Sequence, residues 1–273
     1  MLFFRNLEEP PLHKALLQQA YDHLEKLCSE PGIKEQVNLL GFTALEIAYL
    51  LNDTKAIALL NPDAPTFQIP MVLRGSSQKV LCTLSQFERL FQVQYRSHLY
   101  FPNYSLLCKV IHECPWILAK SSWGDTHRAL GTQYRSLIQS GTISNVYIEW
   151  IDKKLGYGIC ALENLAAEQC IGSYTGLVRP LKRLYPDING YCFHYPTRFF
   201  SWNYFVIDAL HRGNALRFIN HSDQPNLTPA WALDRGLLHL LLITTRSVAA
   251  GDRLTFNYGE DYWKYRRPLR GNC

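Results

Sequence analysis

The sequence has no Cys-x-x-Cys pair, no long apolar run and no dense basic block ahead of its C-terminal end. Eight cysteines are scattered over 273 residues, which indicates reduced, mostly buried thiols of an intracellular protein rather than a disulfide framework. Cys108, His112 and Cys114 have the chemistry of metal ligands, but a fourth ligand at suitable spacing is missing. Small hydrophobic residues on a helix are the alternative, and we expect no metal site.

The most apolar run, Leu237 to Ile243, is interrupted by His239 and has the length of a strand, so no transmembrane helix is predicted. The segment from Met1 to Arg5 is too short for the apolar core of a signal peptide. A net charge of +5 is mildly basic and spread along the chain, which leaves direct nucleic-acid binding open. We therefore expect a soluble intracellular protein of the cytoplasm or nucleus, with no membrane partner.

What the first half does have is helical spacing of its apolar residues. The spacing predicts a helix from Pro10 to about Glu30 and more helices between Leu84 and Leu118, with breaks at residues 101–103 and at Pro115. We assign residues 1–140 to an N-terminal helical domain.

Residues 37–61 form a distinct unit inside this domain. A glycine turn and a Thr able to cap a helix precede two short apolar helices, which is typical of one ankyrin repeat. Glu46 stands where such repeats usually have His. Any helix-turn-helix would give similar spacing, so both interpretations stay open.

The second half changes pattern. Short runs rich in β-branched and aromatic residues are separated by Gly, Pro, Asn and Asp, which predicts strands of small sheets. The seven runs are 146–150, 158–162, 171–174, 191–195, 204–208, 237–243 and 254–258. We therefore predict an α+β protein, with a mostly β domain at 145–263 and a C-terminal tail at 264–273.

Two stretches of this β domain carry the chemistry. Arg217 to Asn226 is an apolar run that leads into Asn220 and His221, and Leu254 to Gly259 is a β-prone run that delivers Tyr258 to a glycine turn. Together and in this order they resemble the paired signature of the SET domain. That resemblance implies several small sheets with a knot-like C-terminal segment, and transfer of a methyl group from S-adenosyl-L-methionine to a protein lysine.

The resemblance also implies where the cofactor binds. The turn Leu155-Gly156-Tyr157-Gly158 would let the backbone approach the methionine part of S-adenosyl-L-methionine. Asn220 and His221 would bind its two ends, with Arg217 alongside. The alternative for His221 is a purely structural role, and the alternative for Tyr262 is ordinary packing. The implied cofactor-binding residues are Leu155, Gly156, Tyr157, Gly158, Tyr191, Arg217, Asn220, His221, Tyr258 and Tyr262.

By the same resemblance, Tyr258, Tyr174 and Phe256 form the catalytic set. Tyr258 would orient the substrate amine, and Tyr174, in Tyr174-Thr175-Gly176, would line the lysine channel. Phe256 occupies the position that governs how many methyl groups fit, and a Phe there predicts di- or trimethyl-lysine as the product.

One departure from the family concerns zinc. Asp223 stands where the family often has Cys, and no Cys-rich segment precedes the domain, so zinc modules are not expected. The substrate channel would then be closed by the segment Lys264 to Cys273 or by a second subunit of a homodimer.

The expected partner is a protein with an exposed lysine tail, and a histone is the commonest family substrate. Compact SET proteins without zinc modules resemble bacterial members, so delivery to a host cell is an expectation that rests on analogy. The alternative function is a catalytically inactive SET-fold interaction module. Retention of Tyr174, Asn220, His221 and Tyr258 together argues against that alternative.

Overall fold

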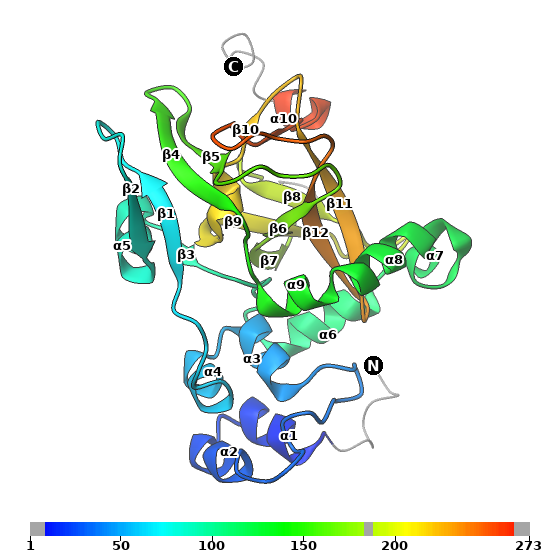
Figure 1. Ribbon diagram of the computed structural model, residues 1–273. Coiled ribbons are helices and arrows are strands. Elements are labelled where there is room, and N and C mark those ends of the chain that lie inside the picture. The colour runs from blue at the N-terminus through cyan, green and yellow to red at the C-terminus, as the bar shows by residue number, and fades with distance from the viewer. Residues whose placement is uncertain (1–8, 183–187, 265–273) are drawn as a thin grey trace.

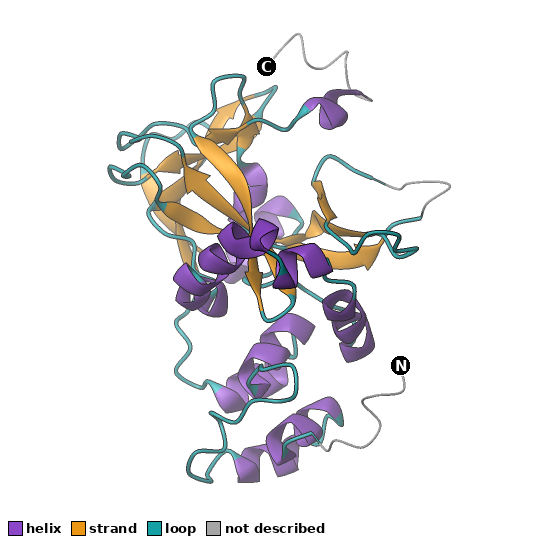
Figure 2. Ribbon diagram, turned by 90° about the vertical axis from the view of Figure 1, so that its right-hand side faces the viewer, coloured by secondary structure: helices purple, strands orange, loops and turns teal. Residues whose placement is uncertain are grey.

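The structure is a computed structural model that describes residues 9–182 and 188–264 (Figure 1). Short helices make up most of the N-terminal half, and small sheets make up the C-terminal half (Figure 2). The predicted α+β class, with a helical region followed by a mostly β region, is confirmed. The tail assigned to 264–273 lies outside the described residues except for Lys264.

The first helical pattern splits in two. Helix α1 (Pro11–Leu17) ends before Gln19, whose φ of 55° is left-handed, and α2 (Tyr21–Leu27) follows after the turn. The single helix predicted from Pro10 to Glu30 is therefore wrong in its middle. A left-handed residue stops the α1 hydrogen bonds there, although the apolar spacing continues through the turn.

The unit at residues 37–61 forms a helix pair, α3 (Ala44–Leu51) and α4 (Thr54–Leu60). Thr43 and Glu46 form a reciprocal capping box at the start of α3, in which the Thr43 N–H donates to the Glu46 carboxylate at 2.8 Å. Its ankyrin-like character stays a prediction, because one helix pair fits either interpretation.

Helices α5 (Leu84–Phe91) and α6 (Tyr104–His112) and the start of α7 (Trp116–Lys120) lie within residues 84–118, where the spacing predicted helices, and the chain breaks at residues 101–103 and at Pro115 as predicted. The 3-10 helix η1 (Ser122–Gly124), α8 (Asp125–Gln133) and α9 (Arg135–Ser140) follow beyond that range, and the spacing did not predict them individually. No helix of the part that the structure describes is long and apolar enough to span a bilayer.

The strand predictions are confirmed for all seven runs. These are β4 (Val146–Asp152), β5 (Gly156–Ala161), β6 (Cys170–Tyr174), β8 (Cys192–Tyr195), β9 (Phe205–Gly213), β12 (Leu237–Thr244) and β13 (Thr255–Phe256). Three further strands described in this half were not predicted, namely β7 (Gly176–Pro180), β11 (Leu227–Asp234) and the two-residue β10 (Asn220–His221).

Three strands also lie in the half expected to be helical. Strands β1 (Gln68–Val72) and β2 (Lys79–Thr83) form a hairpin, and β1 pairs in parallel with β4, which gives the sheet order β2-β1-β4-β5. The short β3 (Gln94–Tyr95) pairs with the end of β9. The domain division near residues 140–145 therefore stays a prediction, and two sheets cross it.

The two halves share one hydrophobic core, which extends from Leu12 of α1 to Phe256 of β13. Strand β12 lies in the middle of the sheet β11-β12-β6 and is buried along nearly its whole length. Within this frame, β10 pairs in parallel with β13. The frame thus brings the two sequence stretches of the predicted site side by side.

Candidate active site

The site begins at the β10–β13 pair. Asn220 lies opposite Thr255 and His221 lies opposite Phe256, and the Ser222 N–H donates to the Phe256 carbonyl at 3.3 Å. Two residues per strand form a weak ladder, because so few hydrogen bonds hold it. Asn226 reinforces it, since its side chain accepts from the Thr255 N–H at 2.8 Å and donates to the Arg253 carbonyl at 2.8 Å.

Tyr258 is fixed at both ends by the β10 segment. Its hydroxyl donates to the Ile219 carbonyl at 2.8 Å, and its N–H donates to Nδ1 of His221 at 3.2 Å. Because Nδ1 accepts, the proton of a neutral His221 ring is assigned to Nε2. Nε2 is buried, and it lies 3.3 Å from the Asp223 carboxylate. The two groups are not aligned for a hydrogen bond.

Four aromatic rings form a continuous wall that leads to this tyrosine. The ring centroids lie 4.8 Å apart for Tyr174 and Phe193, 5.7 Å for Phe193 and Phe256, and 4.8 Å for Phe256 and Tyr258. The structure thus brings all three predicted catalytic residues together. It adds Phe193 of β8, which the sequence interpretation had treated only as part of a strand.

Tyr174 is buried in this wall, and its hydroxyl donates to the Tyr191 carbonyl at 2.9 Å. Burial raises the pKa of Tyr174 well above its ordinary value, so the phenol is neutral at physiological pH. Strand β6 is thereby tied to the segment that enters β8.

Tyr191 is held from the other side by Arg217 of the 3-10 helix η2 (Ala215–Phe218). The guanidinium lies 4.0 Å from the Tyr191 ring centroid and donates to the carbonyls of Ala209 at 2.8 Å and Leu210 at 3.1 Å. The structure therefore places Arg217 against Tyr191 and the β9 backbone.

The corner before Tyr191 depends on Asp208 of β9. The Tyr191 N–H donates to the Asn189 side chain at 2.8 Å, and the Asn189 amide donates to Asp208 at 2.9 Å. Arg179 donates to the same carboxylate at 2.8 Å. Burial acts to raise the pKa of Asp208, but these hydrogen bonds outweigh it, so its pKa lies below the ordinary value.

The Gly-x-Gly turn approaches Asn220 closely. Gly156 has a φ of +72° and open space around its Cβ position, whereas a Cβ on Gly158 would lie 3.0 Å from Nδ2 of Asn220. That amide donates to the Tyr157 carbonyl at 3.4 Å. At the start of the turn, the Leu155 N–H donates to Asp152 at 2.7 Å. Bare backbone thus faces an amide side chain, a cradle that fits the amino-acid end of the expected cofactor.

Helix α5 supports this cradle from the N-terminal half. The Phe91 ring lies 5.1 Å from the Tyr157 ring and 4.4 Å from the Phe218 ring. Phe87 also contacts Phe218 at 6.1 Å. Two predicted cofactor segments, 155–158 and 217–221, therefore rest on a helix from the other half of the chain, a contact that local patterns did not predict.

Helix α10 (Glu260–Lys264) closes the described part of the site. Its Tyr262 ring lies 4.6 Å from the Tyr258 ring, and the Trp263 ring is stacked on Tyr258 at 6.3 Å and lies 4.9 Å from His221. Trp263 is buried, and within the described ranges its Nε1 has no hydrogen-bond partner. The segment proposed to close the channel, Lys264 to Cys273, lies outside the described residues beyond position 264.

Metal chemistry finds no support among residues 9–182 and 188–264, where no group of three or more His, Cys, Asp or Glu side chains is placed to hold a metal ion. Cys108 and Cys114 are free thiols. Burial raises the pKa of Cys114 to about 11.

Comparison with protein families gives one match to this part of the chain. The family model of the SET domain matches residues 156–259, which run from the Gly-x-Gly turn to the glycine after Tyr258. The match includes the β10–β13 pair and the whole aromatic wall.

Similar curated proteins are histone-lysine N-methyltransferases. The chain is 26% identical over 138 residues to human EHMT1, 31% over 112 residues to human SETD2 and 34% over 110 residues to ASHH3 of Arabidopsis thaliana. These alignments cover 49%, 40% and 39% of this chain but only 10%, 4% and 30% of the relatives. Among solved structures, KRYPTONITE with mCHH DNA, an H3(1-15) peptide and SAH is 31% identical over 42% of this chain and 23% of that chain, with a TM-score of 0.35.

Proposed function

We propose that residues 156–259, which match the family model of the SET domain, transfer a methyl group from S-adenosyl-L-methionine to the ε-amine of a lysine in a protein substrate. The observation that carries this proposal is the aromatic wall that ends at Tyr258 beside the Asn220-His221 pair. An aromatic wall suits a long aliphatic side chain with an amine at its end. The neighbouring amide, imidazole and bare backbone suit a polar cofactor.

The residues that would hold the cofactor come from the turn at 155–158, from β10 and from Tyr191, Tyr258 and Tyr262. The fit rests on the close approach of Gly158 to Asn220 and on the buried, unaligned Nε2 of His221. When bound, S-adenosyl-L-methionine supplies an electrophilic methyl on a positively charged sulfur. In this proposal Arg217 acts by holding Tyr191 in place.

The substrate lysine must lose its proton before it can attack. A free lysine has a pKa of about 10.4, so only about one molecule in 2,500 is neutral at pH 7. Phe193, Phe256 and the buried Tyr174 offer no negative charge, and they disfavour the ammonium by desolvation. The wall therefore favours the neutral amine.

Tyr258 would orient that amine. Its hydroxyl proton is directed at the Ile219 carbonyl, so the phenol oxygen can accept a hydrogen bond from an incoming N–H. The His221 contact fixes the backbone of Tyr258 at the same time. A rigid site accelerates the reaction by holding the nitrogen lone pair in line with the bond that breaks.

The finer assignments concern substrate and product. The named relatives are histone-lysine methyltransferases, so a histone tail is the substrate that we propose first. Phe256 lies in the wall between Phe193 and Tyr258 and carries no hydroxyl that would hold a water molecule. We therefore propose di- or trimethyl-lysine as the product, formed on chromatin proteins in a nucleus.

A transfer assay with labelled S-adenosyl-L-methionine and mixed histones tests the activity. Tyr258→Phe should reduce incorporation by about 10²-fold or more, the usual loss when one orienting hydrogen bond is removed from a reacting centre. Tyr195→Phe is the matched control, because its buried hydroxyl accepts from the Leu238 N–H at 2.7 Å on the β11–β12 side of the fold. Equal incorporation by wild type and Tyr258→Phe would refute the catalytic role. No incorporation by wild type on any histone or peptide array would favour the inactive interaction module.

A further inference from the structure

The outer edge of the sheet β2-β1-β4-β5 is a feature that the proposed activity does not use. Strand β2 lies at this edge (Figure 1), and among the described residues no strand pairs with its outer side. Its Val80 is 44% exposed and its Leu81 is 61% exposed. Exposed apolar edge strands are ready templates for pairing with another strand.

The backbone groups of Leu81 face this open side. In an antiparallel pair, residues alternate between those that bond to the neighbouring strand and those that point away from it. Thr83 points away from β1, because its N–H donates to the Gln86 side chain at 2.8 Å. Leu81 lies two residues earlier and shares that direction, and its opposite residue on β1 is Pro70, which has no N–H to offer.

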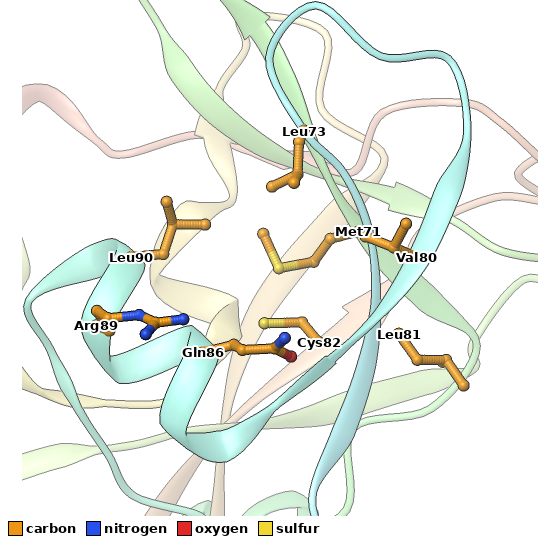
Figure 3. Close-up of a pocket in the computed structure, with 8 residues that line it drawn as sticks. All are labelled: Met71, Leu73, Val80, Leu81, Cys82, Gln86, Arg89 and Leu90. Carbon is orange, nitrogen blue, oxygen red and sulfur yellow. The ribbon is translucent and has the colours of Figure 1, made fainter.

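The side chains of β2 divide between two faces. Val80 and Cys82 point into an apolar groove between the hairpin and α5, whereas Leu81 points away from it (Figure 3). The groove has a volume of about 560 Å³, and besides Val80 and Cys82 its lining includes Met71, Leu73, Gln86, Arg89 and Leu90. On the opposite face, the Lys79 ammonium lies 4.3 Å from the Tyr147 ring centroid.

We propose that this edge is a homodimer interface, in which β2 of a second copy of this chain pairs antiparallel with β2 about a two-fold axis at Leu81. In that register Leu81 faces Leu81 of the second copy, Val80 faces Cys82, and Lys79 faces Thr83. The alternating direction of the backbone groups along β2 also fits this register. The backbone groups of Leu81 face the open side, so the two Leu81 residues form the central hydrogen-bonded pair.

The second copy is the occupant because the strand is its own complement. No charged residue faces a like charge across the axis, since the lone charged residue of β2, Lys79, lies opposite a threonine. The same operation places the two α5 helices and their grooves on one face of the joined sheet, which covers Val80 and Leu90 of both copies. Two four-stranded sheets become one of eight strands, and a two-fold contact of this kind closes without further growth.

Disulfide trapping tests the register directly. In Val80→Cys, the new thiol would lie opposite the native Cys82 of the second copy in a non-hydrogen-bonded pair, the arrangement with the shortest Cβ separation. Mild oxidation should yield a covalent dimer, and mass spectrometry should find a peptide in which position 80 of one copy is linked to Cys82 of the other. Val80→Cys combined with Cys82→Ser is the matched control, because positions 80 of the two copies are offset along the strands and should not bridge.

Sedimentation equilibrium on the full chain tests the interface without a cross-link. Leu81→Lys places two ammonium groups opposite each other at the axis and should weaken dimerisation at least about tenfold. Position 81 is exposed, so the fold should tolerate the change, and circular dichroism checks this. A wild type that is monomeric at all concentrations, a dimer that Leu81→Lys leaves unchanged, or a Val80→Cys variant without the intermolecular bond to Cys82 would each overturn the proposal.

Discussion

Gly158→Ala is the sharpest test of the cofactor cradle. The added Cβ would lie 3.0 Å from Nδ2 of Asn220 and 3.0 Å from Cγ1 of Ile151. Ordinary contact between such atoms begins near 3.4 Å, so a neighbour must retreat by about 0.4 Å. The hydrogen bond from the Asn220 amide to the Tyr157 carbonyl is already long, at 3.4 Å. A retreat of the Asn220 side chain takes the amide beyond hydrogen-bonding distance.

The cost follows from two contributions. Forcing one methyl group into a filled space costs about 1–3 kcal/mol, and a lost hydrogen bond costs about 0.5–1.5 kcal/mol. Part of this is lost stability, and part is lost affinity, because Asn220 leaves the position in which it would meet the cofactor. If about 1.4 kcal/mol falls on binding, the Kd for S-adenosyl-L-methionine rises about tenfold.

Isothermal titration with S-adenosyl-L-methionine measures this change, and Gly32→Ala is its control. Gly32 lies in the turn after α2, outside the proposed cofactor-binding residues, and has a φ of +71° with nothing within 4 Å of its Cβ position, so alanine there costs about 1 kcal/mol of backbone strain without moving Asn220. Both variants should melt at lower temperature than wild type, but only Gly158→Ala should lose affinity. Equal affinities for Gly158→Ala and wild type would refute the assignment of Asn220 to the cofactor.

Two further outcomes are expected. Phe256→Tyr should shift the product toward monomethyl-lysine in mass spectrometry, because the added hydroxyl can hold a water in the space for a second methyl, and a wild type that makes only monomethyl-lysine on every substrate would contradict this. Glu46→Gln should lower the free energy of unfolding by about 1–3 kcal/mol at neutral pH, since it breaks the 2.7 Å ion pair with Arg235. Burial acts to raise the pKa of Glu46, but hydrogen bonds from Arg235 and Thr43 outweigh it and lower the pKa. The stabilisation is therefore present above the ordinary pKa of about 4.3 and lost as the pH falls through the folded value, so urea melts of the two proteins should converge in acid.

Local patterns were sufficient for most strands, whereas the residues of the proposed site came from the family resemblance. The seven alternating runs became strands because each has a buried face, and motif order alone grouped Tyr174, Asn220, His221, Phe256 and Tyr258. Phe193 was missed because a strand phenylalanine carries no polar signal. Its place in the wall follows from β8 pairing with β9, a contact that local sequence does not encode.

The errors elsewhere also have physical causes. The β1–β2 hairpin was missed because Pro70 interrupts a strand pattern. Pro70 is tolerated there because it lies opposite Leu81, in a pair whose backbone groups form no hydrogen bonds between β1 and β2. Strand β11 contains Pro229 and was missed for the same reason. The split between α1 and α2 falls at Gln19 and Ala20, which both leave the helical conformation, and a left-handed φ has no sequence signature in a non-glycine residue such as Gln19.

The arrangement of the site explains why the halves of the chain share one core. Strands β10 and β13 have two residues each and would not hold together alone. They persist because η2 is packed on Phe87 and Phe91 of α5, and because the β11–β12 hairpin is fixed through Arg235 to Glu46 of α3 at 2.7 Å. The N-terminal helices are thus part of the scaffold that positions the proposed lysine channel. A fragment limited to residues 145–263 would lack Phe91 and Glu46, and its Asn220-His221 segment would lose both supports.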